Sequence, residues 1–219
     1  MKKSLTFLKI FVMIFSGITP IKKRRKQSFM SNTEIYTELF NEIESLMKTK
    51  SSVSIAIDGG AASGKTTLAK ILSEKYHAPI IHMDDFFLRS EQRTPERFAE
   101  PGGNFDKERF LREIVPHIGK NEAFSYCVFD CSKMALGGYR EIPKSPLLII
   151  EGSYSHHPAF SDVFDLRVFL STAEDERRKR ILTRNGEKSE MFFTRWIPLE
   201  NRYFEAFSIR EKADIIIFG

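Results

Sequence analysis

The sequence has little of what defines membrane, secreted or metal-binding proteins. Its most membrane-like stretch, residues 10–21, has only 12 uncharged residues, whereas a helix that spans a bilayer needs ~20. The 219 residues include two cysteines, Cys127 and Cys131, and no neighbouring residues complete a metal-binding set around them. We therefore expect reduced thiols in a cytoplasmic protein.

Excess charge is also missing from most of the chain. The formal net charge is +5, but eight of the 34 basic residues and none of the 29 acidic ones lie within residues 1–29. The remainder therefore carries 26 basic and 29 acidic residues, a net charge of −3. Because nucleic-acid-binding domains concentrate positive charge, this balance predicts no nucleic-acid partner.

Residues 1–29 combine an apolar stretch with a basic cluster at residues 22–26. Met30 would be a natural start for a domain. The segment is therefore either an upstream extension or an anchor that contacts a membrane surface through its apolar and basic residues. The sequence leaves both interpretations open, and we expect the folded domain to occupy residues 30–219.

Helical and extended patterns alternate from residue 31 to the C-terminus. The apolar periodicity predicts helices over about 32–48, 65–76, 106–118, 174–184 and 190–207, and buried strands over 53–57, 79–84, 147–150, 165–170 and 213–218. Residues 86–104 are expected to form a long loop, and residues 124–140 a small hairpin flap that brackets Gly137 and Gly138. Strands that alternate with helices predict an α/β fold, with a parallel sheet of about five strands covered on both faces.

The segment DGGAASGKTTLAK has the spacing of a P-loop, Gly59-x-x-x-x-Gly64-Lys65-Thr66, between a predicted strand and a predicted helix. Glycine lets backbone N–H groups curl around a phosphate, and the N-terminus of the next helix favours negative charge. Lys65 is expected to bridge the β- and γ-phosphates of ATP, and the Thr66 hydroxyl to bind Mg²⁺. The predicted phosphate-binding residues are Gly59, Gly60, Ala61, Ala62, Ser63, Gly64, Lys65, Thr66 and Thr67. The fold class is therefore a P-loop NTPase fold.

Two adjacent carboxylates, Asp84 and Asp85, follow the second predicted strand. Parallel sheets bind ligands beyond the carboxyl ends of their strands, so a carboxylate there is expected near the γ-phosphate. It can accept the proton of an attacking hydroxyl, and we assign this role to Asp84, with Lys65 as the other catalytic residue. Successive side chains of extended backbone point in opposite directions. We therefore expect Asp85 to bind loop backbone or the water shell of Mg²⁺.

Two further features complete the predicted ATP site. Glu151 ends the apolar run LLII, which is the Walker B arrangement of a carboxylate that holds Mg²⁺ directly or through water. The helix over 174–184 is rich in arginine and lysine, most of which we expect to be solvated. One or two arginines could close over the triphosphate as a lid, and Arg184 and Arg195 are the predicted pair.

With these motifs assembled, the chain resembles the uridine kinase and nicotinamide riboside kinase group of P-loop kinases over nearly all of residues 51–219. The resemblance rests on the segments GGAASGKTT, DDFF, NFDKERF and EG at Glu151. It implies that Asp84 is the general base and that Asp106, in NFDKERF, binds the ribose hydroxyls. It also implies that Tyr126 and Asp130, in SYCVFDCS, belong to a flap over the substrate's base.

The resemblance is weaker in the segments that determine substrate specificity. The arginine-rich lid of uridine kinases is not intact, EGSYSHHP replaces their usual apolar loop, and the histidine-bearing segment that helps to bind uracil is missing. The resemblance therefore implies the family's chemistry, with ATP and Mg²⁺ as cofactors, more firmly than it implies the family's substrate.

Three functions remain open. The leading interpretation is an ATP-dependent phosphotransferase that acts on a small-molecule hydroxyl, with the 5′-hydroxyl of a nucleoside as the first candidate. A second keeps this mechanism but has another alcohol, such as pantothenate or a sugar, as the acceptor. A third is a nucleotide-dependent switch, although the sequence has no guanine-binding Asn-Lys-x-Asp segment. Homo-oligomers occur in such families, and the sequence shows no decisive interface pattern.

Overall fold

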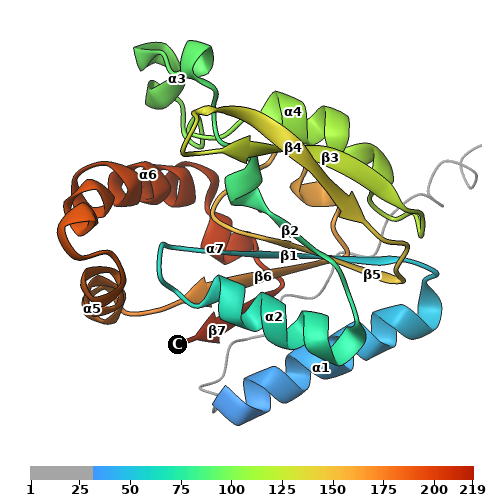
Figure 1. Cartoon of the computed structure of the whole chain (residues 1–219). Helices are drawn as coiled ribbons and strands as arrows, with labels where there is room; N and C mark the ends of the chain where they lie inside the picture. Colours follow the sequence, from blue (N-terminus) through green and yellow to red (C-terminus); the bar gives the residue numbers. More distant parts are fainter. Residues whose placement is uncertain (1–31) are drawn as a thin grey trace, which may run out of the picture. The chain divides into compact units, whose positions relative to one another are not determined.

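The computed structural model describes residues 32–219 of the chain (Figure 1). The segment predicted as an extension or an anchor, residues 1–29, lies outside the described residues. Within the described part, no helix is both long enough and apolar enough to cross a membrane.

A parallel sheet forms the centre of the described part (Figure 1). Its five strands are β1 (Val53–Gly59), β2 (Ile80–His82), β5 (Leu147–Glu151), β6 (Leu166–Ser171) and β7 (Ile215–Phe218). They are arranged in the order β2-β5-β1-β6-β7, and every pair of neighbours is parallel. β1 is therefore central, and all of its residues are buried. This topology confirms the predicted fold.

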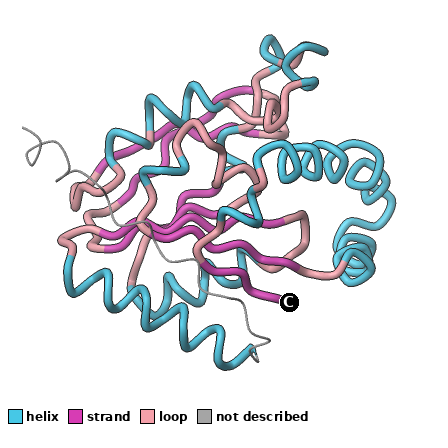
Figure 2. Tube along the Cα trace, turned by 180° about the vertical axis from the view of Figure 1, so that it is seen from behind, coloured by secondary structure: helices cyan, strands magenta, loops and turns pink. Residues whose placement is uncertain are grey.

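Helices cover both faces of the sheet, as the view from behind also shows (Figure 2). One face packs against α1 (Asn32–Thr49) and α2 (Lys65–Tyr76), and the other lies under α4 (Lys107–Glu113), α6 (Ile197–Phe207) and α7 (Ile209–Lys212). Because strand side chains alternate in direction, Ile55 and Ile57 belong to the first core and Ala56 to the second. Because the five strands are parallel, the loops that follow them lie together at the carboxyl ends of the strands.

The connection after β2 differs from the prediction. The strand ends at His82, and Met83–Phe86 form a 3₁₀ turn, so Asp84 and Asp85 do not lie in extended backbone. The predicted loop over 86–104 contains a second 3₁₀ turn, Ser90–Gln92, and the short helix α3 (Pro95–Ala99). Proline at the start of α3 and Thr94, which accepts a hydrogen bond from the Arg97 N–H, explain why a helix forms there.

The predicted flap is an antiparallel hairpin of β3 (Phe124–Asp130) and β4 (Ala135–Ile142). Its turn lies at residues 131–134, so the prediction that the hairpin brackets Gly137 and Gly138 was wrong. Both glycines lie inside β4. The pairing is irregular between Cys127 and Phe129, which shifts the register ahead of the turn.

Two helical regions follow β6. The charged helix α5 (Glu174–Asn185) lies where it was expected. The predicted helix over 190–207 is also helical, but Phe192–Trp196 form a π-helical segment before α6, in which Ile197 N–H donates to Phe192 O. Pro198 has no N–H to donate, and the wider turn accommodates this loss.

Candidate active site

The P-loop joins the end of β1 to the start of α2. Gly59 and Gly64 have φ angles of +147° and +103°, which L-residues rarely adopt. A Cβ atom on Gly59 would lie 2.5 Å from Leu170 O on the neighbouring strand, so this position also needs glycine for space. The loop can therefore fold back over the N-terminus of α2, where backbone N–H groups favour an anion.

Lys65 lies at the base of this loop. Its side chain is buried, and Nζ donates to Gly59 O at 2.8 Å and to Gly60 O at 3.0 Å. Both partners are neutral carbonyls, so the charge of the ammonium is not neutralised by these contacts. A phosphate in the loop would supply the missing negative charge, which fits the predicted role of this lysine.

Thr66 and Glu151 meet beside the P-loop as predicted for a magnesium site. The Thr66 hydroxyl lies 3.3 Å from each carboxylate oxygen of Glu151. His82, at the end of β2, places Nδ1 2.6 Å from Glu151 Oε1, and this hydrogen bond is the main cause that raises the pKa of His82. Hydroxyl and carboxylate oxygens suit Mg²⁺, which binds one or two protein oxygens together with substrate phosphates.

Asp84 lies at the open side of this cluster. Its side chain is exposed to solvent, although protein atoms surround it closely enough that their desolvation raises its pKa. The negative charge of Glu151 raises the pKa of Asp84 further, whereas Lys65 lowers it. An accessible carboxylate with a raised pKa and no competing hydrogen-bond donor among the described residues is suited to accept a proton.

Asp85 has a different environment. Its carboxylate Oδ2 accepts a hydrogen bond from the Tyr126 hydroxyl at 2.6 Å and forms an ion pair with Arg140 Nη1 at 2.9 Å. Arg109, which is buried, donates to the backbone oxygens of Asp85 and Cys127. Asp85 thus ties the 3₁₀ turn to the hairpin, and its carboxylate is not directed to the predicted magnesium site.

The polar groups of the two predicted flap residues already have partners within the protein. Tyr126 is 1% exposed and stacks on Phe86 in the core, with its hydroxyl bound to Asp85. Asp130 lies at the end of β3, where Ser132 donates to its carboxylate and holds its pKa down to about 2. Neither residue therefore offers a free group to a substrate in this arrangement.

Asp106 is the N-cap of α4 and is almost completely buried. Its Oδ1 accepts the Arg109 N–H at 3.0 Å, and its Oδ2 accepts Gln92 Nε2 at 2.9 Å. Gln92 comes from the 3₁₀ turn that precedes α3. A substrate diol would have to displace Gln92 before it could reach this carboxylate.

The predicted lid arginines do not contact the P-loop. Arg184 donates to Asn185 and lies over the Phe192 ring, and Arg195 lies over the rings of Phe98 and Trp196. In this arrangement Arg184 lies too far along α5 to reach the loop, and Arg195 lies beyond it in the π-helical segment, so their lid role stays a prediction.

Two other arginines of α5 contact the P-loop instead. The guanidinium of Arg177 lies so close to Gly60 that a Cβ atom there would be 1.5 Å from Nη1. Arg180 Nη1 donates to Ala62 O at 3.3 Å. Arg177 also lines a cavity of about 470 Å³ between the start of α5 and α6, and Gly60 lines the same cavity. Positions 177 and 180 are three apart and share one helix face.

We expect R177Q and R180Q each to raise the KM for ATP about 10-fold, because each variant loses a cation beside the phosphate-binding loop. R184Q is the matched control, since it removes an equal charge from the same helix away from the loop. Initial rates at varied ATP concentration measure the effect. A larger rise of the KM for ATP in R184Q than in the other two variants would support Arg184 as the lid residue.

Glu200 is a site residue that the sequence reasoning missed. This buried carboxylate on α6 accepts the Ala61 N–H of the P-loop at 2.9 Å and the Ser153 hydroxyl at 2.6 Å. Burial raises the pKa of Glu200, while Lys65 lowers it. One turn later, the Tyr203 hydroxyl donates to Asp58 Oδ2 at 2.8 Å. The i, i+3 spacing of a carboxylate and a tyrosine on an apolar helix face was the available sequence signal.

We expect E200Q to bind ATP about 3- to 10-fold more tightly, because the variant removes a negative charge next to the place where the phosphates bind. Glutamine keeps the size of the side chain and can still accept one hydrogen bond. Calorimetric titration with ATP measures the change. Weaker binding in E200Q would instead show that Glu200 holds the loop in its binding conformation.

Comparisons with known proteins agree with this architecture. No family model matches the chain. The chain is 27% identical over 185 residues to a uridine kinase from Chlamydia pneumoniae, a match that covers 75% of this chain and 81% of that protein. Among solved structures, a protein from Bacillus stearothermophilus described as a possible uridine kinase has a TM-score of 0.61 at 22% identity and covers 82% of this chain and 99% of its own.

A second solved structure, provisionally assigned as a fructose transport system kinase from a Silicibacter species, has a TM-score of 0.60 at 19% identity. It covers 85% of this chain and 98% of its own. At these identities the structural neighbours define the fold alone. The chain therefore has the fold of the P-loop kinases. Its resemblance to the uridine kinases, inferred from its motifs, is confirmed by its similarity to the chlamydial protein.

Proposed function

We propose that this chain is an ATP-dependent kinase that transfers the γ-phosphoryl group to a hydroxyl group of a small molecule. The observation that carries the proposal is the placement of Asp84. It is an accessible carboxylate within electrostatic range of both Lys65 of the P-loop and Glu151 of the magnesium site. An acceptor hydroxyl against Asp84 would face the γ-phosphate of ATP held in the P-loop.

The proposed reaction is an in-line transfer. Asp84 takes the proton of the acceptor hydroxyl while the oxygen of that hydroxyl bonds to the γ-phosphorus. The bond between the γ-phosphorus and the β–γ bridging oxygen breaks, which releases ADP. Lys65 and the N-terminus of α2 hold the phosphates and offset their charge. Thr66 and Glu151 would hold Mg²⁺, which when bound neutralises charge on the β- and γ-phosphate oxygens.

A nucleoside is the first acceptor to test, because the curated relative from Chlamydia pneumoniae is a uridine kinase. A second candidate, another alcohol, is favoured by one feature of the site. Asp106, the residue expected to bind a ribose diol, is buried and already bound by Gln92 and the Arg109 N–H. In this arrangement no carboxylate oxygen of Asp106 is open to a sugar.

Product analysis tests the acceptor. The full chain is incubated with ATP and Mg²⁺ together with uridine, cytidine or ribose, and phosphate esters are separated by anion-exchange chromatography. Formation of uridine or cytidine monophosphate would support the nucleoside assignment. An ester of another alcohol alone would keep the mechanism and change the acceptor. Tight ATP binding without any ester would favour the nucleotide-dependent switch.

A further inference from the structure

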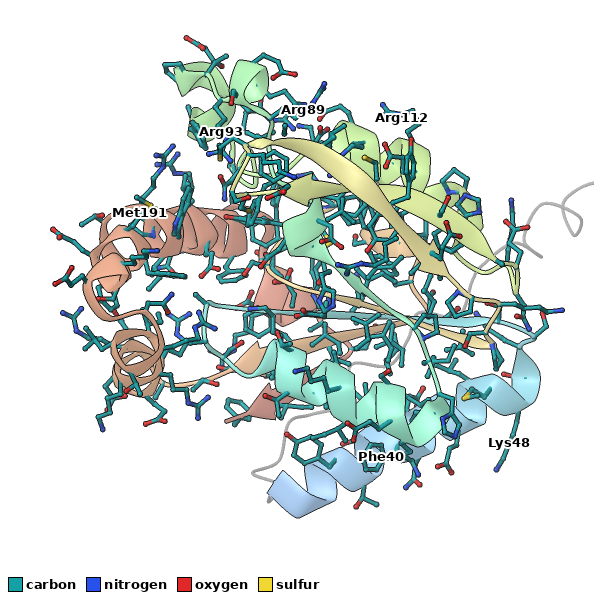
Figure 3. All side chains as sticks on the ribbon, viewed as in Figure 1. Phe40, Lys48, Arg89, Arg93, Arg112 and Met191 are labelled. Carbon is teal, nitrogen blue, oxygen red and sulfur yellow. The ribbon has the colours of Figure 1, made fainter. Side chains whose placement is uncertain are left out.

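Arg93 and Arg195, here called the arginine pair, come together from two elements beside the hairpin. Arg93 follows the Ser90–Gln92 turn, and Figure 3 shows it between α3 and the hairpin. Its Nε donates to Leu88 O at 2.9 Å, and its guanidinium carbon lies 5.9 Å from the centroid of the Phe129 ring. The backbone and the ring thus fix the guanidinium.

Arg195 approaches from the π-helical segment Phe192–Trp196. Its guanidinium carbon lies 4.8 Å from the ring centroids of both Phe98 and Trp196. Phe98 belongs to α3, whose backbone is also held by Arg202 Nη1, which donates to Phe98 O at 3.1 Å. Arg195 therefore lies where the π-helical segment meets Phe98 of α3, the helix that begins two residues after Arg93.

The arginine pair has no anionic partner within the described residues. Neither guanidinium forms an ion pair with a carboxylate in the part of the chain that the structure describes. Burial lowers the pKa of Arg93, and the positive charge of Arg195 lowers it further. By contrast, Arg97 of α3 forms an ion pair with Glu108.

Arg93 contacts the hairpin through Phe129. Asp84 lies next to the same hairpin, which binds its neighbour Asp85. Cys131, at the turn of the hairpin, is within electrostatic range of both Asp84 and Arg93. A molecule that places a hydroxyl against Asp84 and extends along the hairpin would therefore reach Arg93.

We propose that the arginine pair binds an anionic group, a carboxylate or a phosphate monoester, carried by the alcohol that is phosphorylated. This inference rests on the proposed kinase function and specifies its acceptor class. Two positive charges within electrostatic range of each other and without an acid favour an anion, and the planar N–H groups of guanidinium match both carboxylate and phosphate oxygens. Arg177 and Arg180, which contact the P-loop, leave the arginine pair free for the acceptor.

Three matched acceptor pairs test the inference in ADP-release assays with the full chain, ATP and Mg²⁺. The pairs are D-pantothenate with D-panthenol, D-ribose 5-phosphate with D-ribose, and glycerol 3-phosphate with glycerol. Within at least one pair we expect the anionic member to have a kcat/KM at least 10-fold higher than its neutral partner. Equal use of both members, or a preference for uridine or cytidine that R93Q and R195Q do not change, would overturn the inference and keep the kinase function.

Variants connect the effect to the arginine pair. We expect R93Q and R195Q each to lower kcat/KM for the anionic acceptor about 10- to 100-fold, and that of its neutral partner by less than about 3-fold. R112Q is the control, because Arg112 is exposed on α4 and pairs with Glu113, away from the arginine pair (Figure 3). Losses of equal size for the anionic and the neutral member would contradict the assignment.

A binding measurement separates this inference from the kinase proposal. The P-loop is saturated with a non-hydrolysable ATP analogue and Mg²⁺, and inorganic phosphate is then titrated by calorimetry. We expect binding that weakens at least 10-fold in R93Q and R195Q and is unchanged in R112Q. If the wild-type chain binds no phosphate, the inference is wrong even if the chain is a kinase. If phosphate binding weakens in R93Q and R195Q but the chain phosphorylates no alcohol, the kinase proposal alone fails.

Discussion

D84N is expected to lower kcat for phosphoryl transfer about 10²- to 10⁴-fold and to leave the affinity for ATP within about 3-fold of the wild type. Asparagine keeps the size and polarity of the side chain but cannot take the acceptor's proton. Its amide also lacks the negative charge that lies near Lys65 and Glu151. Steady-state rates with the best acceptor and a calorimetric titration with ATP measure the two quantities.

D85N is the matched control for this variant, because the two aspartates are adjacent and only their surroundings differ. Asp85 is bound by Tyr126 and Arg140, so D85N should lower the thermal stability of the protein more than its kcat. Near-normal turnover in D84N, or a larger loss of kcat in D85N than in D84N, would reverse the assignment of the two residues.

K65M is expected to lower kcat/KM for ATP about 10²- to 10³-fold. The ammonium is buried at the base of the P-loop, where it lowers the pKa values of Asp84 and Glu200 and would face the phosphates of bound ATP. Methionine fills the same space without the charge. ADP-release kinetics at varied ATP concentration measure the loss, and a thermal unfolding curve shows whether the variant is folded.

The contradicting outcome for K65M is specific. If the folded variant turned over ATP within about 3-fold of the wild type, the loop would not bind the transferred phosphate. Gly59 and Gly64 would then serve only the turn between β1 and α2.

Local sequence patterns predicted the frame of the site. The P-loop pattern is contiguous and needs a strand before it and a helix after it, and all of these features lie within residues 53–76. Glu151 was equally accessible to prediction, because the carboxyl ends of parallel neighbouring strands meet at one edge of the sheet. There β5 pairs with β1, and Thr66 meets Glu151.

The parts that the sequence did not predict depend on contacts between distant segments. The helix after β6 carries several cations, and which of them reaches the P-loop depends on where α5 packs along the sheet. The structure brings Arg177 and Arg180, near the start of α5, to the loop and leaves Arg184, near its end, beside Phe192. Glu200 reaches the P-loop from a residue 139 positions later, a separation that no local periodicity reveals.

The two aspartates show the same limit. Separate roles for Asp84 and Asp85 were predicted from the alternation of side chains along an extended strand, but the backbone there is a 3₁₀ turn. The partners of Asp85 come from the hairpin, 41 positions away for Tyr126. Tyr126 was predicted as a substrate residue because SYCVFDCS resembles the flap of the uridine kinases, and its burial against Phe86 was not visible in the sequence.

The most direct test of the account is the fate of the γ-phosphate. The full chain is incubated with γ-labelled ATP, Mg²⁺ and a mixture of nucleosides, sugars, pantothenate and phosphorylated alcohols, and the label is counted in organic esters and in inorganic phosphate. The account predicts that the label enters an organic ester in a one-to-one ratio with ADP, and that D84N abolishes this ester. Release of the label only as inorganic phosphate, at a rate that no acceptor changes, would contradict it.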